Sequence, residues 1–222
     1  MTTLPTVKIV RHVRAKSLRL RVYPHQICLT VPPRCGQGQI DQFLKQSEAW
    51  LIETWQKVGQ QNAVDFPKYL QLFGQTEPTQ IQRIEQKSLF QFDGSTNTLF
   101  LQQEHAALAL KRFIVEYAKM VLPQKLQQNS LSMNLPFQGL QVRHAKSRWG
   151  SCSSKHKIML NAALVLLPEA LIDYVCIHEL VHTQHFDHSP AFWHAVQRFD
   201  PNYLQHQQQL KQFNWPIWWL EA

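Results

Sequence analysis

No stretch of the sequence is apolar over the roughly 18 residues that a membrane-spanning helix needs, so we expect no membrane segment. The first 16 residues become basic without an apolar stretch, which argues against a secretory signal peptide. The cysteines are scattered and form no C-x-x-C pair: Cys28, Cys35, Cys152 and Cys176. This pattern argues against a disulfide scaffold and against a thiolate metal site. It is typical of a reducing compartment, so we expect a cytoplasmic protein.

Acidic residues are missing from the first 40 residues, where the chain carries seven lysines and arginines. The whole chain has a net charge of +8, so the rest of it is close to neutral. Such an asymmetry can mark a surface for nucleic acid or another polyanion. We favour a solvated strand face, because apolar residues alternate with arginines over 17–22 and no aromatic residues are interleaved for base stacking. The basic N-terminus, with Arg11, Arg14, Arg19 and Arg21, is therefore expected to make at most a weak nucleic-acid contact.

Hydrophobic periodicity predicts an α+β fold in two parts. Residues 1–103 form a mostly β part with one helix, and residues 104–222 form an α+β part that carries the chemistry. Strands are predicted at 16–22, 27–31, 69–73, 79–84, 89–92, 98–101, 141–146 and 157–164. Helices are predicted at 39–58, 104–128, 168–184 and 190–199, with a kink or a new helix at Pro123. The short aromatic tail at 215–220 is expected to plug the core.

The predicted helix at 168–184 contains the pattern H-E-x-x-H, formed by His178, Glu179 and His182. Residues four apart lie one turn apart on the same helix face, so both imidazoles can reach one ion. Zinc accepts neutral imidazole nitrogen, and Glu179 would stand where a general base can reach a metal-bound water. From composition, the pattern is expected roughly 0.02 times by chance in a chain like this one. The helix is also apolar on most sides, and buried polar groups there need a partner, which a metal supplies.

A catalytic zinc needs a third protein ligand and one open position. His188 follows His182 by six residues, beyond a predicted helix end, and a ligand returning from a turn can complete the tetrahedron. His185 competes with it, but on a continuing helix its ring would point further along. We favour His188. Asp173 and Asp187 are conceivable acceptors for an imidazole N–H, although exposed carboxylates are the simpler interpretation.

Several segments around this motif resemble one known family. They are residues 147–152 (Ser-Arg-Trp-Gly-Ser-Cys), Asn161, residues 173–174 and residues 188–193 (His-Ser-Pro-Ala-Phe-Trp). Together they are similar to the YgjP-like metallopeptidase domain, which is related to SprT-like and WLM-type proteases. The resemblance extends over nearly the whole chain. It implies a minimal zincin-type fold with the cleft along an edge strand, zinc held by His178, His182 and His188, and Glu179 as the base.

Arg148 in the same segment has two interpretations. If the strand after it borders the cleft, the guanidinium could stabilise the oxyanion that forms when water attacks a carbonyl. The alternative is structural, with Trp149 filling a core gap and Gly150 permitting a bulge or turn. Tyr174, one turn before His178, is expected to be a packing residue with its hydroxyl at the surface.

The sequence thus predicts a zinc-dependent hydrolase, favoured as a metallopeptidase that acts on a peptide or protein substrate. Two alternatives stay open. The first is a metal-dependent hydrolase of a non-peptide substrate such as a nucleoside triphosphate, which the basic N-terminus would suit. The second is a DNA-associated module with a structural zinc. That module would need a fourth protein ligand, for which the sequence offers only His185.

Overall fold

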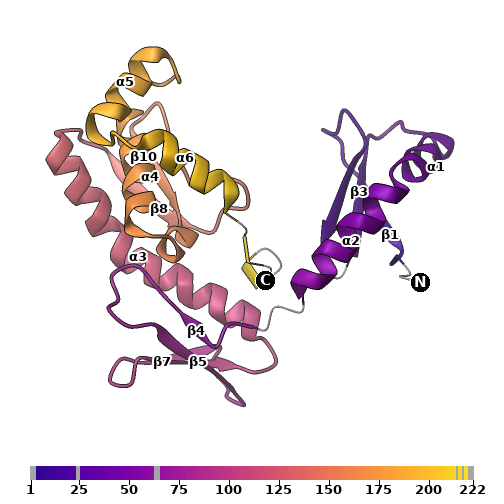
Figure 1. Ribbon diagram of the computed structural model, residues 1–222, viewed down its shortest axis with the longest axis horizontal. Coiled ribbons are helices and arrows are strands. Elements are labelled where there is room, and N and C mark those ends of the chain that lie inside the picture. Colours follow the sequence, from indigo (N-terminus) through magenta and orange to yellow (C-terminus); the bar gives the residue numbers. More distant parts are fainter. Residues whose placement is uncertain (1–3, 24–25, 63–65, 214, 217, 220–222) are drawn as a thin grey trace. The chain divides into compact units, whose positions relative to one another are not determined.

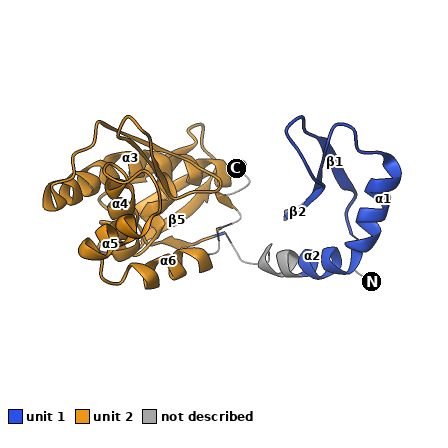
Figure 2. Cartoon of the chain, turned by 90° about the horizontal axis from the view of Figure 1, so that it is seen from above, with its two compact units in different colours: residues 1–66 blue, residues 67–222 orange. Residues whose placement is uncertain are grey.

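The computed structural model describes residues 4–23, 26–62, 66–213, 215–216 and 218–219. The chain divides into two compact units, residues 1–66 and residues 67–222 (Figure 2). The boundary therefore lies at residue 66, whereas the sequence pattern placed it near residue 103. The fold is α+β, as expected. Within the described residues, no helix is both long and apolar enough to cross a membrane.

The first unit is a three-stranded sheet followed by two helices. The strand order is β1-β3-β2, and the elements are β1 (Val7–Arg11), β2 (Arg19–Tyr23), β3 (Gln26–Val31), α1 (Gln37–Gln46) and α2 (Glu48–Asn62). The strands predicted at 16–22 and 27–31 correspond to β2 and β3, which pair antiparallel as a hairpin. The parallel pairing of β1 with β3 was not predicted. The predicted single helix is two helices that are divided at Ser47.

Alternation along β3 builds the core of the first unit. Leu29 and Val31 are fully buried on one face of the strand, together with Ile40 of α1. Leu18 and Leu20 pack against this cluster. Arg19 and Arg21, which alternate with them, therefore face the other side of the sheet. The strand period that the sequence indicated is therefore present.

The second unit begins with a four-stranded sheet of order β4-β5-β7-β6. Its strands are β4 (Tyr69–Leu70), β5 (Thr79–Ile84), β6 (Phe90–Asp93) and β7 (Thr98–Gln102). This sheet packs on the long helix α3 (Ala106–Met133), where Phe113 contacts both Phe90 and Phe92. The Tyr117 hydroxyl of α3 also donates a hydrogen bond to the Phe73 carbonyl. These contacts explain why residues 67–103 belong to the second unit.

Helix α3 is a single helix that contains Pro123, so no new helix begins there. It ends at Asn134, whose φ of 54° lies in the left-handed region. The helix contacts both sheets of the second unit, because it packs on β6 and β7 and also on β8. It therefore lies at the centre of the unit (Figure 1).

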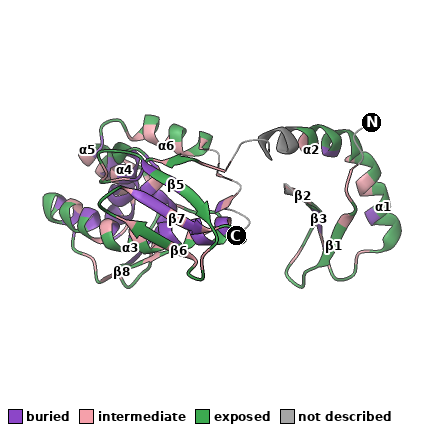
Figure 3. Ribbon diagram, turned by 90° about the horizontal axis from the view of Figure 1, so that it is seen from below, coloured by how far each residue is buried: buried purple, intermediate pink, exposed green. Residues whose placement is uncertain are grey.

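The remaining elements surround the H-E-x-x-H motif. They are β8 (Gly139–Arg143), β9 (Gly150–Cys152), β10 (Lys157–Asn161), the 3-10 helix η1 (Ala162–Leu166), α4 (Glu169–Val181), α5 (Pro190–Phe199) and α6 (Tyr203–Gln212). The sheet order is β8-β10-β9, so β9 is an edge strand. Helix α4 packs on α3, α5, α6 and β9, and it is mostly buried (Figure 3). Trp219 of the tail is fully buried, in agreement with the expected plug.

Candidate metal centre

The structure brings His178, His182 and His188 together. One ring nitrogen from each lies within 4.8 Å of the others, and His178 Nε2 is 3.2 Å from His188 Nε2. Two nitrogens bound to one tetrahedral zinc at about 2.05 Å would be separated by about 3.3 Å. The cluster therefore has the spacing that a shared metal ion requires. Among the described residues, it includes His188 and not His185.

Local hydrogen bonds and packing fix the orientation of the three rings. His182 Nδ1 lies 2.8 Å from the His185 carbonyl, so it acts as the donor and leaves Nε2 with a free lone pair. His185 thus contributes its backbone oxygen to the site. Phe192, which is fully buried, contacts all three imidazoles at centroid distances of 4.9, 4.5 and 4.8 Å. The Phe192 ring thus supports all three imidazole rings by direct packing.

The third histidine is positioned by the start of α5. Ser189 caps this helix by accepting a hydrogen bond from Phe192 N. Pro190 occupies the first turn, where its missing N–H costs no helical hydrogen bond. Asp187 accepts a hydrogen bond from Ser189 N, which holds the segment on both sides of His188. Asp173 forms an ion pair with Lys125 instead, so in this structure neither aspartate accepts a hydrogen bond from a clustered imidazole.

The surroundings of His178 and His182 favour their neutral imidazole forms. Burial, followed by the neighbouring histidines, lowers the pKa of His178 to about 3. Burial also lowers the pKa of His182. Neutral rings are the form that binds metal, so protons compete weakly for these nitrogens. His178 Nδ1 is buried and has no hydrogen-bond partner among the described residues.

Glu179 lies beside the histidines and is only 5% exposed. Burial raises the pKa of its carboxyl to about 8, while the charge of Arg148 acts in the opposite direction. Its Oε2 is buried without a hydrogen-bond partner in the described part of the chain. A buried carboxyl without partners is costly as an anion, and a divalent cation held by the imidazoles would compensate that cost.

Gly150 on the edge strand β9 makes room for this carboxyl. A Cβ added at Gly150 would lie 2.5 Å from Glu179 Oε1 and 2.6 Å from its Cγ. Real Cβ atoms do not approach other heavy atoms so closely, so glycine is required here unless Glu179 moves. From the sequence, Gly150 was expected only to permit a bulge or turn.

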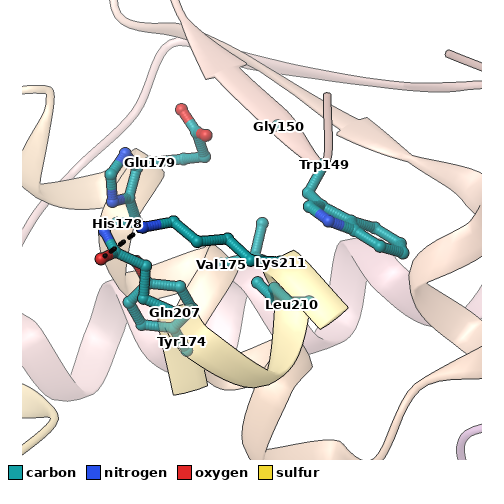
Figure 4. A pocket seen from close by; sticks show the side chains of 9 residues that line it. All are labelled: Trp149, Gly150, Tyr174, Val175, His178, Glu179, Gln207, Leu210 and Lys211. Carbon is teal, nitrogen blue, oxygen red and sulfur yellow. Dashed lines mark hydrogen bonds between the residues drawn. The ribbon is translucent and has the colours of Figure 1, made fainter. Parts of the chain in front are cut away.

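A cavity of about 390 Å³ opens beside His178 and Glu179 (Figure 4). Trp149 forms part of its wall and stacks on Trp215 at a centroid distance of 4.3 Å. Tyr174 lines the cavity and is only 4% exposed, and this burial raises the pKa of its hydroxyl to about 12. This differs from the predicted surface hydroxyl. The reason is that α6 covers this face of α4.

Arg148 belongs to the loop that precedes β9, and Asn161, the last residue of β10, contacts this loop. The Arg148 side chain is exposed and is not part of the cavity wall, although its charge acts on Glu179. Asn161 is fully buried, and its Nδ2 donates to the carbonyls of Ala145 and Arg148. Asn161 N also donates to the Trp149 carbonyl. Asn161 therefore holds the loop that delivers Trp149 and Gly150 to the cavity.

Sequence reasoning assigned no role to Asn161 or Phe192 beyond the resemblance. A polar residue at the end of the apolar run 158–160 was the available signal for Asn161. Phe192 follows the Ser-Pro helix start by three residues, which identifies a core-facing position but not its contact with three imidazoles. That contact depends on tertiary packing.

Two solved structures of metallopeptidase zymogens are similar to the chain: jannalysin of Methanocaldococcus jannaschii and abylysin of Pyrococcus abyssi. Jannalysin is 18% identical with a TM-score of 0.37, over 41% of this chain and 94% of its own. Abylysin is 23% identical with a TM-score of 0.38, over 40% and 91% respectively. No curated protein matches the chain significantly.

The family comparison covers far more of the chain. Residues 16–213 match the model of the YgjP-like metallopeptidase domain, and this span includes the three histidines, Glu179 and the loop before β9. The resemblance that the motifs indicated is therefore confirmed over most of the sequence. The chain belongs to the YgjP-like metallopeptidase family.

Proposed function

We propose that this protein is a zinc-dependent metallopeptidase in which His178, His182 and His188 bind the metal and Glu179 is the general base. One observation carries the proposal: three imidazole nitrogens converge beside a buried carboxyl at the edge of a cavity. The family supports metal-dependent peptide hydrolysis as the class of reaction. The residue roles and the identity of the metal are our inference from the geometry.

Zinc fits the donor set better than the other common protein metals. The cluster offers three imidazoles and neither thiolate nor carboxylate among the described residues. Three protein ligands leave one position open, which is the arrangement of a catalytic rather than a structural zinc. When bound, zinc supplies Lewis acidity, which lowers the pKa of a coordinated water toward about 7 and polarises a carbonyl.

Glu179 would move the protons of the reaction. Its carboxylate takes a proton from the attacking water and then delivers it to the leaving amine, as general acid–base catalysis requires. Its burial keeps competing solvent away from the proton transfer. Arg148, whose charge acts on this carboxyl, would stabilise the negative charge that develops on the substrate oxygen.

The substrate would bind along the edge strand β9. This strand pairs only with β10 among the described strands, so an extended peptide can add to its other edge by β-augmentation. The glycine at the start of β9 would bring that peptide close to Glu179. The adjoining cavity, with Trp149, Val175 and Leu210 in its wall, would receive an apolar side chain of the substrate.

A metal-replacement experiment tests the proposal. The purified chain is stripped with a chelator, reloaded with zinc, and assayed against a fluorogenic peptide mixture and, in parallel, against nucleoside triphosphates. We expect zinc-dependent peptide cleavage that disappears in Glu179→Gln while its zinc content stays at one ion per chain. Triphosphate hydrolysis without peptide cleavage would support the non-peptide alternative instead.

A further inference from the structure

The first unit contains a strongly basic cavity of about 480 Å³ that the proposed peptidase site does not use. Its wall carries His12 and four permanent cations: Arg14, Lys16, Arg19 and Arg21. Ala15, Ser17 and Thr30 complete the lining, which therefore contains no carboxylate and no Phe, Tyr or Trp. This composition points to an anionic ligand.

Two local features of the fold gather these charges. Arg19 and Arg21 lie two residues apart on β2, so both project from the sheet face opposite to the one that Leu20 buries. The loop 12–17 lies against that face, and its turn is held by hydrogen bonds from Ala15 N to the His12 carbonyl and from Arg14 N to His12 Nδ1. The cations are therefore arranged by backbone structure.

Arg11 differs from the other basic residues of the N-terminus. One of its guanidinium nitrogens donates to the carbonyls of Pro32, Pro33 and Cys35, so this side chain is used within the fold. No carboxylate of the described residues forms an ion pair with Arg14, Lys16, Arg19 or Arg21. Four like charges around one cavity repel each other unless an anion is bound between them.

We infer that this cavity binds the phosphodiester backbone of nucleic acid. Three of the four cations are arginines, whose planar guanidinium matches phosphate oxygens in a bidentate geometry. The lining has no Phe, Tyr or Trp on which bases would stack, so recognition would depend on charge rather than on sequence or unpaired bases. It also has no apolar side chain larger than Ala15, whereas an interfacial membrane site needs an apolar face.

Fluorescence anisotropy of the full chain with a labelled duplex and with the matching single strand tests the inference. Four phosphate contacts predict a slope of log K against log salt of about −3 to −4, with binding weakened strongly at physiological salt. The duplex should bind more tightly than the single strand, because its charge density is higher and no stacking favours the single strand. A preference for the single strand would contradict backbone recognition.

The decisive variant replaces Arg14, Lys16, Arg19 and Arg21 by glutamine. Its matched control removes the same charge from four exposed lysines elsewhere, Lys45, Lys68, Lys87 and Lys155. We expect the cavity variant to lose tenfold or more in duplex affinity at low salt and to lose most of the salt slope, and the control to keep both. Equal losses in the two variants would show that only net charge matters, and would overturn the site.

Two further measurements distinguish nucleic acid from other polyanions and this cavity from the proposed peptidase site. Vesicles rich in phosphatidylserine and poly-glutamate should bind more weakly than duplex at equal salt, and tighter binding to either one would overturn the assignment. Circular dichroism establishes that the variant is folded. Zinc content and peptide cleavage should be unchanged in it, so failure of this inference is distinguishable from failure of the proposed function.

Discussion

The Gly150→Ala substitution tests the contact between the edge strand β9 and Glu179, the proposed general base. The added Cβ would lie 2.6 Å from Glu179 Cγ and 2.8 Å from its Cδ, whereas carbon atoms in contact stand about 3.5–4.0 Å apart. Because β9 is paired with β10 and Glu179 is buried on α4, a shift of about 1 Å must be shared between them. A 1 Å misplacement of a catalytic group can cost about 10²-fold in rate.

We therefore expect kcat/KM for peptide cleavage to fall about 10²-fold in Gly150→Ala, with a loss of about 1–3 kcal/mol in the free energy of unfolding from overpacking. Zinc content should stay at one ion per chain, because no histidine is touched. The matched control is Gly139→Ala on β8, where the new Cβ would stand 3.9 Å from Lys157 Cγ. Activity within threefold of the parent in Gly150→Ala would refute the reasoning.

Three further predictions concern the metal centre. Metal analysis should find that His188→Ala loses zinc on dialysis and that His185→Ala keeps it, because His185 contributes only its carbonyl. Phe192→Leu removes the aromatic ring that packs against the three imidazoles. Zinc affinity measured with a competing chelator should therefore fall about tenfold or more. In the metal-free folded protein the pKa of Glu179 is about 8, whereas in the unfolded chain it is about 4.5. The folded state therefore binds more protons between these pH values, and the free energy of unfolding falls as the pH rises from 4.5 to 8. His178 has a pKa of about 3 in the folded protein, so it raises stability with pH only below its ordinary pKa of 6.5. Urea unfolding of the metal-free protein should therefore show a free energy of unfolding that falls from pH 6.5 to 8, and Glu179→Gln should abolish this fall.

The parts of the site that could be predicted from the sequence depend on local sequence patterns. Two imidazoles four residues apart on a helix face each other whatever the surrounding fold, and Ser189-Pro190 starts a helix by its own chemistry. The bounds of α5 agree with the prediction for the same reason, since Asp200-Pro201 ends it. His188 could be favoured because a turn brings it back toward the helix end.

Contacts between distant segments explain what the sequence did not predict. The pairing of β1 with β3 is parallel and non-local, and no local pattern specifies a partner of this kind. The sheet at 69–102 belongs to the second unit through Phe113 and Tyr117 of α3, which only packing reveals. The approach of Gly150 to Glu179 joins residues on a strand and a helix that periodicity treats separately.

The unequal exposure of the three histidines bears on how a metal would enter and leave. His188 is exposed and stands on the segment between α4 and α5, whereas His178 is partly buried on α4 itself. A chelator would reach His188 first, and local opening of that segment would withdraw His188 while His178 stays on α4. The exchange rate would then follow the opening of a few residues rather than global unfolding, and the stripped protein would keep α4 in place for reloading.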